Sequence, residues 1–199
     1  MKVTRYSEGC GALISDIQLA DLSVTQLADL RTIFAKHGLL FFRDQDFSPQ
    51  DHLQFAQRFG SIVVNKFFRA TEQFPEIAEV RKEKEQQTNI GGGWHTDHSY
   101  DDIPAMGSIL VARKLPETGG DTQFANLANA YDALSPQIKS RIENLRAVHS
   151  NKHLYGENGL YRMTDLAEHL GGMDRVGDAT HPVVIMHPES GRKVLYVNP

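Results

Sequence analysis

The sequence predicts an α+β fold in which helices flank an antiparallel sheet. Short apolar runs bounded by glycine, proline or aspartate recur along the 199 residues, and such runs are typical of strands. Two stretches instead carry apolar residues at helical spacing behind residues that favour a helix start. Near the end, two apolar runs are joined by residues 188–191, which predicts a hairpin with a longer loop. This mixture, without repeats or linkers, favours a single α+β domain over residues 1–199.

Two helices have clear start signals. Ser23 and Gln26 have the spacing of a capping box, and leucines follow at helical intervals, so a helix is predicted over 24–36. Pro49 is the first helical residue of a second amphipathic helix, because its fixed φ suits the first turn. Gly60 ends this second helix.

The remaining stretches are predicted to be strands and loops. Residues 83–93 are polar and then glycine-rich, which predicts a mobile loop, and residues 156–180 predict a loop or lid with a short helical piece. The last apolar strand runs into Pro199, so we expect the domain to be incomplete at its C-terminus. Strands are predicted over 11–17, 39–42, 61–64 and 77–81, around His95, and over 107–113, 121–124, 182–186 and 193–197, and a third helix is predicted over 136–145.

The composition favours an ordinary globular protein. Apolar residues make up 40% and charged residues 23%, and the net charge of -4 argues against a nucleic-acid partner, which would need a basic face. No apolar run is long enough to span a membrane, and no signal peptide is recognisable. The single cysteine, Cys10, fits a reducing compartment, so we expect a cytoplasmic protein.

The most informative motif is His95-Thr96-Asp97, which follows a run of three glycines. In a strand, side chains two residues apart point to the same face, so His95 and Asp97 are expected to converge. One imidazole and one carboxylate are two of the three ligands in the facial triad that holds non-haem Fe(II). The triad needs a second histidine, and His98 is expected on the opposite face of the strand.

Two other interpretations of this motif remain open. The pair could be the polar face of a surface strand, because a histidine two residues before an aspartate is common. Zinc also accepts histidine and aspartate, although the zinc-hydrolase pattern requires an earlier histidine where this chain has Gly93. The other histidines are expected to be structural or solvated, and these are His37, His52, His149, His153, His181 and His187.

A second short motif is Gly119-Gly120-Asp121-Thr122. Taken alone, it predicts a turn before a strand. The hydroxyl of Thr122 could also donate a hydrogen bond to a bound carboxylate.

In combination, these segments resemble the Fe(II)- and 2-oxoglutarate-dependent dioxygenases of the taurine dioxygenase and phenoxyacetate-herbicide dioxygenase (TauD/TfdA-like) type. The resemblance extends over nearly the whole chain, with its motifs in the family's order. It is carried by residues 39–45, 55–60, 94–97, 115–122, 181–184, 187–193 and 196–198.

The resemblance implies a double-stranded β-helix, or jelly roll, with flanking helices. It also implies a dioxygenase that hydroxylates a small anionic organic substrate such as a sulfonate, sulfate ester or carboxylate, using Fe(II), 2-oxoglutarate and O2. A homo-oligomer is compatible with it. Under this resemblance His95 and Asp97 bind iron, Thr122 binds the distal carboxylate of 2-oxoglutarate, and Asn65, Phe68, Tyr155 and Tyr196 contact substrate.

The chain departs from the family pattern in two ways. The taurine enzyme has a histidine where this chain has Asn65 and a tyrosine where it has Phe68, so taurine is not the expected substrate. The family's distal iron histidine and its 2-oxoglutarate arginine fall beyond the position equivalent to Pro199, and the chain supplies neither. The alternative to an enzyme is a truncated, non-catalytic remnant of one.

Overall fold

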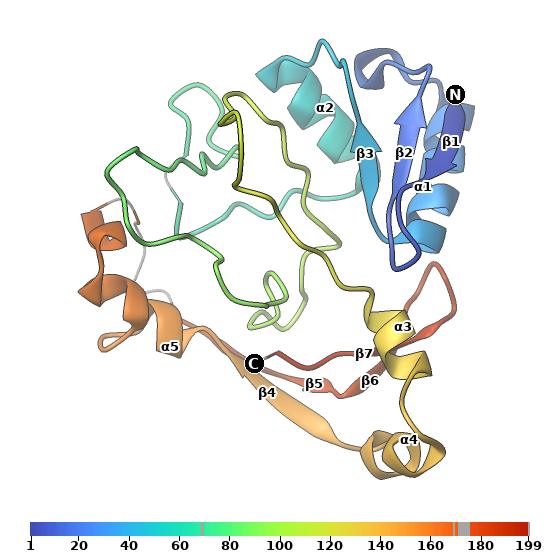
Figure 1. The fold of residues 1–199 in the computed structure, drawn as a ribbon, viewed down its shortest axis with the longest axis vertical. Coiled ribbons are helices and arrows are strands. Elements are labelled where there is room, and N and C mark those ends of the chain that lie inside the picture. The colour runs from blue at the N-terminus through green and yellow to red at the C-terminus, as the bar shows by residue number, and fades with distance from the viewer. Residues whose placement is uncertain (69, 169, 171–175, 199) are drawn as a thin grey trace. The chain divides into compact units, whose positions relative to one another are not determined.

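The computed structural model describes residues 1–68, 70–168, 170 and 176–198 (Figure 1). Helices and strands are mixed, as predicted, and within these residues the strands form one three-stranded and two two-stranded sheets. The chain divides into two compact units, each assembled from separate stretches of sequence. Unit 1 comprises Met1–Phe59, Ile109–Leu145 and Val184–Tyr196, and unit 2 comprises Gly60–Ser108, Arg146–Val183 and Val197–Pro199.

The three-stranded sheet of unit 1 has the order β1 (Lys2–Arg5), β2 (Ala12–Ser15) and β3 (Leu40–Phe42). β1 pairs with β2 antiparallel, whereas β2 pairs with β3 parallel. The expectation of a wholly antiparallel sheet is therefore wrong. The reason is the long connection between β2 and β3, which contains α1 (Val24–His37) and provides the crossover that parallel strands require.

Helix α1 begins and ends as its sequence predicts. The Ser23 hydroxyl accepts a hydrogen bond from the Gln26 amide N–H, and the Gln26 side chain accepts one from the Ser23 N–H, so the capping box is formed. Gly38 has φ 72° and closes the C-terminus. The other elements of unit 1 are η1 (Leu19–Asp21), α2 (Pro49–Phe59), α3 (Leu127–Asp132), α4 (Pro136–Ile142) and the predicted hairpin of β6 (Val184–Met186) and β7 (Lys193–Leu195).

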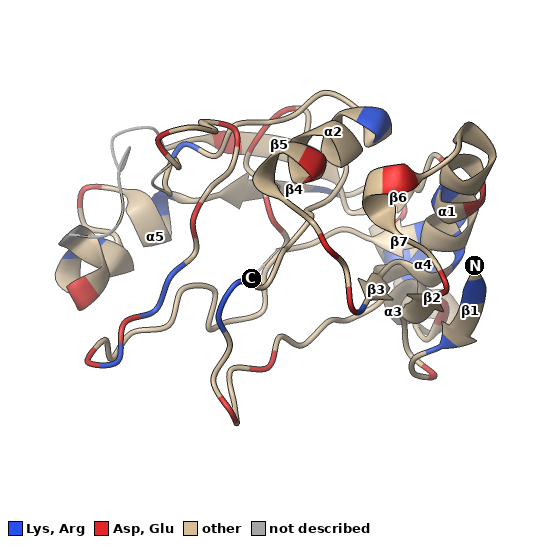
Figure 2. Cartoon of the chain, turned by 90° about the horizontal axis from the view of Figure 1, so that it is seen from above, with Lys and Arg blue, Asp and Glu red and all other residues tan. Residues whose placement is uncertain are grey.

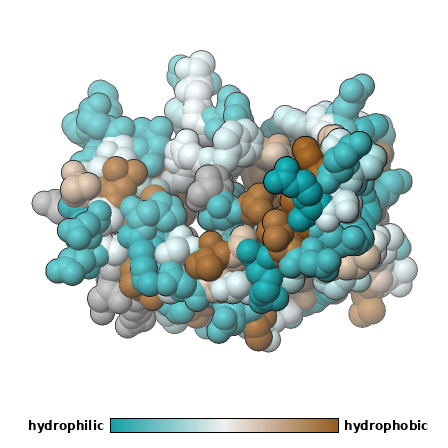
Figure 3. Space-filling model, turned by 90° about the horizontal axis from the view of Figure 1, so that it is seen from below, coloured by the Kyte–Doolittle hydropathy of each residue, from teal (hydrophilic) through white to brown (hydrophobic). Residues whose placement is uncertain are grey.

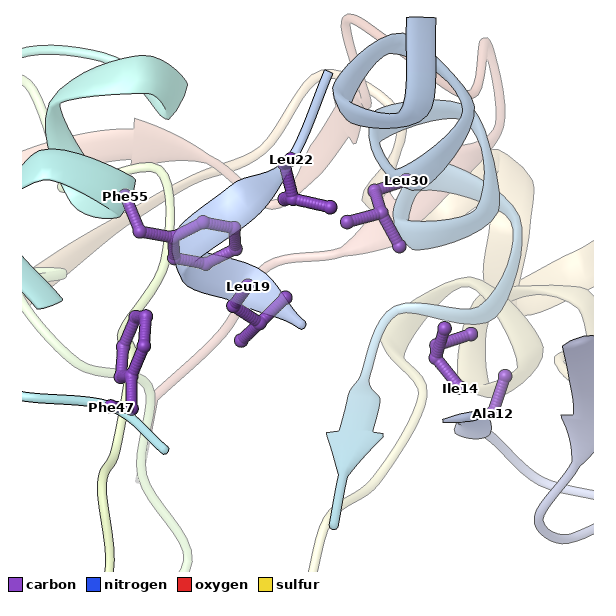
Figure 4. Packing of buried hydrophobic residues seen from close by; sticks show 7 residues of the cluster. All are labelled: Ala12, Ile14, Leu19, Leu22, Leu30, Phe47 and Phe55. Atoms are coloured by element: carbon purple, nitrogen blue, oxygen red, sulfur yellow. The ribbon is translucent and has the colours of Figure 1, made fainter. Parts of the chain in front are cut away.

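The core of unit 1 is an apolar cluster that joins strand, helix and loop. Leu30 of α1 is fully buried, and the Phe47 and Phe55 rings meet edge to face with centroids 5.9 Å apart. Ile109 and Val111 pack against the same cluster from a distant part of the sequence. Figure 4 shows the seven buried members, Ala12, Ile14, Leu19, Leu22, Leu30, Phe47 and Phe55.

Unit 2 has its own core, rich in aromatic residues. Phe67 is 1% exposed and stacks on Tyr155, with ring centroids 3.9 Å apart. Leu166 is fully buried in the same cluster, which we call the aromatic cluster: Phe67, Tyr155, Tyr161, Leu166 and Leu170. The elements of unit 2 are the antiparallel pair β4 (Arg146–Ser150) and β5 (Asp178–Pro182), α5 (Lys152–Tyr155), η2 (Leu160–Met163) and η3 (Asp165–Glu168).

Several predicted strands are absent from the described residues. Residues 107–113 do alternate, because Ile109 and Val111 are half-buried while Leu110 is 73% exposed, but they join no ladder. A strand exists only when a neighbouring strand takes its backbone hydrogen bonds, and the local pattern cannot supply that neighbour. The same correction applies to 61–64, to the segment around His95 and to 121–124, and in 77–81 only Ala78 is paired, in an isolated antiparallel bridge with Ala70. Part of the predicted lid at 156–180 lies outside the described residues.

The surface carries both charge and apolar area. Basic and acidic residues are interspersed along the chain (Figure 2). Apolar side chains are exposed at several places, including Ile103, Leu115 and Met163, and brown apolar patches are visible on the face drawn in Figure 3. In the described part of the chain, no helix combines the length and apolar character needed to cross a membrane.

Candidate metal centre

The segment that carries His95 and Asp97 is irregular rather than a strand. Asp97 opens a turn in which the Asp101 N–H donates to the His98 carbonyl at 3.0 Å, and His98 has a left-handed φ of 56°. The two side chains nevertheless meet, because His95 Nε2 lies 3.1 Å from Asp97 Oδ1. The expected strand is wrong, but the expected convergence is present.

Hydrogen bonds orient both side chains of the pair. The His95 Nδ1–H donates to the Gly93 carbonyl at 2.8 Å, which leaves the Nε2 lone pair directed away from that bond. Asp97 Oδ2 accepts a hydrogen bond from the Ser108 hydroxyl at 3.2 Å, so Oδ1 is the oxygen that faces the imidazole. Contacts of this kind fix the tautomer and the direction of metal ligands.

The geometry of the pair fits a cation. Two acceptor atoms, Nε2 and Oδ1, face each other, and such a contact is favourable only when a proton or a metal ion lies between or beside them. Two ligand atoms that are each about 2.1 Å from a metal and at right angles to it lie about 3 Å apart. The side chains of His95 and Asp97 are 45% and 60% exposed, so an ion has access to them.

The backbone around the pair is held by contacts from distant parts of the sequence. The Thr96 N–H, between the two residues, donates to Asn198 Oδ1 at 2.8 Å. His181 on β5 is buried, and its Nε2–H donates to the Ser99 carbonyl at 2.9 Å and to the Asp101 carbonyl at 3.1 Å. The turn that follows Asp97 is therefore fastened to β5.

His98 makes its own contact with a carboxylate, and the strand on whose opposite face it was expected does not form. Its Nδ1 lies 2.9 Å from Asp101 Oδ2. Over the residues that the structure describes, no three histidine, cysteine, aspartate or glutamate side chains gather in a cluster that could hold a metal ion. His95 and Asp97 are thus a two-ligand arrangement in this part of the chain.

Three of the predicted substrate residues belong to unit 2, as His95 and Asp97 do. Asn65 Oδ1 accepts hydrogen bonds from the N–H groups of Phe67 at 2.8 Å and Phe68 at 3.1 Å, so its side chain shapes the loop that it begins. Phe68 packs on the aromatic cluster, and Tyr155 is one of its members. Burial raises the pKa of Tyr155, with smaller contributions from neighbouring groups that include Asp97.

Tyr100 follows Asp97 closely in sequence and packs against the aromatic cluster. Burial, followed by the charges of Asp101 and Asp97, raises the pKa of Tyr100 to about 12. The hydroxyl therefore stays protonated across the physiological range and can both donate and accept a hydrogen bond.

The remaining predicted site residues belong to unit 1. Thr122 exposes its side chain in an irregular stretch. Tyr196 is half-buried, and burial raises its pKa. Their roles toward a co-substrate and a substrate stay predictions.

The structure also shows residues that sequence reasoning missed. Ser108, Tyr161 and Asn198 form hydrogen bonds with residues 91–97, and His181, which was expected only to be structural or solvated, donates to the Ser99 carbonyl. The sequence showed only that all four side chains can form hydrogen bonds. Their positions along the chain gave no indication of proximity.

A protein-family model identifies the family of this chain. The model of the "Taurine catabolism dioxygenase TauD, TfdA family" matches residues 2–199. The chain belongs to this family. The resemblance predicted from the separate motifs is thereby confirmed for the whole matched length.

Individual TauD, TfdA relatives are moderately similar to the chain. It is 31% identical to the (S)-phenoxypropionate/alpha-ketoglutarate-dioxygenase of Sphingobium herbicidovorans over 94% of this chain and 67% of that protein. It is 36% identical to the alkylsulfatase of Acinetobacter baylyi over 98% of this chain and 62% of that protein. It is 31% identical to the alpha-ketoglutarate-dependent sulfonate dioxygenase of Saccharomyces cerevisiae, over 100% of this chain and 49% of that protein.

Solved structures are similar over the same extent. A taurine dioxygenase from Burkholderia xenovorans superimposes with a TM-score of 0.79 at 29% identity, covering 100% of this chain and 63% of that one. AAD-2, solved in complex with Mn(II) and N-oxalylglycine, has a TM-score of 0.73 at 29% identity, over 99% of this chain and 69% of that one. The chain thus spans about half to two thirds of the length of these TauD, TfdA proteins.

Proposed function

We propose that this chain carries the iron-binding part of an Fe(II)- and 2-oxoglutarate-dependent dioxygenase that hydroxylates a small anionic organic molecule. The reaction converts the substrate C–H, O2 and 2-oxoglutarate into the C–OH product, succinate and CO2. The observation that carries the proposal is the 3.1 Å approach of His95 Nε2 to Asp97 Oδ1, two acceptor atoms that would hold a cation. Membership of the TauD, TfdA family supports it.

Each proposed site residue has a separate task. His95 and Asp97 would hold Fe(II), which supplies the redox chemistry that activates O2 when it is bound. The Gly93 carbonyl and the Ser108 hydroxyl keep the two ligands in their orientation. The Thr122 hydroxyl would donate to the distal carboxylate of 2-oxoglutarate, and a hydrogen bond to a charged group is among the stronger ones.

The proposed substrate is an anion that Asn65 recognises. Its Oδ1 is occupied by the N–H groups of Phe67 and Phe68, so its Nδ2 amide is the group left to meet a ligand. An amide N–H donates, and oxygens of a sulfonate, sulfate ester or carboxylate accept. The names of the relatives refer to a phenoxypropionate, a sulfonate and an alkyl sulfate, which share such oxygens. Phe68, Tyr155 and Tyr196 would supply the apolar remainder of the substrate site.

The architecture proposed for the domain is the double-stranded β-helix with flanking helices, in one domain over 1–199. The superpositions on the taurine dioxygenase and on AAD-2 support this architecture. We also propose a cytoplasmic location, which the single cysteine in 199 residues supports. We further propose a homo-oligomer, and analytical ultracentrifugation would test it.

The test is metal binding followed by turnover. Mn(II), which reports binding in an EPR titration, should bind the wild-type protein and should bind His95→Ala and Asp97→Ala at least tenfold more weakly, because each loses a ligand. Succinate release in the presence of Fe(II) should fall in parallel. The control is His153→Ala, an exposed histidine on α5 that should leave Mn(II) affinity unchanged. Wild-type affinity for Mn(II) in either ligand variant would contradict the assignment.

A further inference from the structure

The glycine run before His95 touches both sides of the imidazole. On one side, the Gly93 carbonyl accepts the Nδ1–H hydrogen bond. On the other side, a Cβ added to Gly91 would lie 3.1 Å from His95 Cε1 and 3.7 Å from Nε2. Gly91 also has φ 68°, which side-chain-bearing residues rarely adopt. The backbone at Gly91 therefore lies against the edge of the ring that carries the proposed ligand atom.

A buried tyrosine fixes this backbone. The Gly91 N–H donates to the Tyr161 hydroxyl at 3.2 Å, across 70 residues of sequence. Tyr161 lies on η2, is 5% exposed, and packs edge to face on Tyr155 with ring centroids 5.3 Å apart. Tyr155 in turn stacks on Phe67. The aromatic cluster thus fixes the position of the Tyr161 hydroxyl, and the hydroxyl in turn holds the Gly91 backbone by one hydrogen bond.

We infer that Tyr161 is a positioning residue for the metal centre: its hydroxyl holds Gly91, and Gly91 holds the His95 ring in the orientation that faces Asp97. The inference rests on the proposed function in so far as the ring binds a metal. It requires no contact between Tyr161 and the metal or substrate. Because only one atom of Tyr161 makes the link, its effect is separable from the contribution of its ring to the core.

The consequence of losing this atom follows from the contacts. Without the hydroxyl, the Gly91 N–H loses its partner and exchanges with solvent, while the ring still fills the aromatic cluster. The His95 ring then samples orientations in which Nε2 does not face Asp97 Oδ1. Groups that hydrogen-bond to a metal ligand change metal affinity about 10- to 100-fold, and a group one contact further away should have an effect at the lower end, about tenfold.

The experiment compares Tyr161→Phe with wild type in two measurements. The first is hydrogen exchange at the Gly91 amide without metal, where protection should be lost. The second is Mn(II) affinity by EPR titration, which should weaken about tenfold while the melting temperature changes little. The matched control is Tyr131→Phe, which removes the hydroxyl of an equally buried tyrosine in unit 1 and should change neither measurement.

A second variant tests the same link from the loop. Gly91→Ala leaves the aromatic cluster intact but introduces a Cβ that crowds His95 at a φ unfavourable for alanine. It should also weaken Mn(II) binding, and it decides the question if Tyr161→Phe does not fold. Wild-type Gly91 protection in Tyr161→Phe, or wild-type Mn(II) affinity in Gly91→Ala, would overturn the inference. Failure of the wild type itself to bind Mn(II) would instead refute the proposed function, and Gly91 exchange would still decide whether Tyr161 holds the loop.

Discussion

The proposed co-substrate site can be tested by replacing the hydroxyl of Thr122 with a methyl group. Thr122→Val keeps the β-branched shape of the side chain but removes a hydrogen bond to a charged carboxylate, which costs about 1.5–3 kcal/mol. The affinity for 2-oxoglutarate should therefore fall about 10- to 100-fold, while Mn(II) affinity stays constant. The control is Thr180→Val, an exposed threonine on β5. A loss of Mn(II) affinity in Thr122→Val would show that its role is not in co-substrate binding.

A substitution of Asn65 can distinguish its role in shaping the loop from its proposed role in binding substrate. Asn65→Asp retains an oxygen that can accept from the Phe67 and Phe68 N–H groups, but it replaces the free amide donor with a carboxylate oxygen. The variant should fold normally and should raise the KM for anionic substrates at least tenfold, because like charges now meet. Succinate release over a panel of sulfonates, sulfate esters and carboxylates measures this. An unchanged KM across the panel would remove Asn65 from the substrate site.

Among single residues, the sequence indicated that His95 and Asp97 converge, but it did not indicate the groups that orient them. His95 and Asp97 are two positions apart, so almost any extended backbone brings them near each other, and they meet even without the predicted strand. Ser108, Tyr161 and Asn198 reach the same segment from 11, 70 and 102 residues away. Only the tertiary fold creates these contacts, so no local pattern could have indicated them.

At the scale of elements, helix α2 carries a pH-dependent contribution to stability. His52 Nε2–H donates to the Ile109 carbonyl at 3.2 Å, and burial lowers the pKa of His52 below 6.5, with Arg113 adding to this effect. The unfolded chain therefore takes up the proton first as pH falls. The contribution of His52 is complete above about pH 6.5 and declines below it until the folded-state pKa is passed.

Urea unfolding between pH 8 and pH 5 tests this expectation. His52→Gln can still donate to Ile109 but does not titrate, so its free energy of unfolding should fall less than that of wild type as the solution is acidified. The difference between the two proteins is the measurement, because other histidines titrate equally in both. A constant difference across the whole range would show that burial does not suppress protonation of His52.

Elements defined by local signals were predicted well, and elements defined by pairing were not. The capping box at Ser23 and the proline at Pro49 satisfy backbone groups within a few residues, and both helices form as predicted. The turn at 188–191 likewise determines the β6–β7 hairpin. In contrast, 107–113 has the alternation of a strand but no ladder, and β4 pairs with β5 across a separation that its own sequence does not reveal.

At the scale of the whole molecule, the two apolar clusters should be separable by mutation. Leu30 and Leu166 are both fully buried, one in each cluster, and either leucine-to-alanine change should cost about 2–5 kcal/mol. Hydrogen exchange monitored by mass spectrometry should show the largest loss of protection in unit 1 for Leu30→Ala and in unit 2 for Leu166→Ala. Equal losses in both units for both variants would mean that the two cores unfold only together.

The way the chain alternates between the two units constrains how the protein is made. Unit 1 contains Met1–Phe59 but is completed by Val184–Tyr196, and the segments of unit 2 lie between and after these stretches. During translation, the first strands leave the ribosome long before the β6–β7 hairpin exists, and much of the partner surface of both cores is still unsynthesised. Apolar side chains of the nascent chain therefore remain exposed to water, where they can aggregate or bind chaperones. We expect unit 1 to be completed only after Val184–Tyr196 has been synthesised, so that the yield in a cell depends on chaperone supply more than on translation rate.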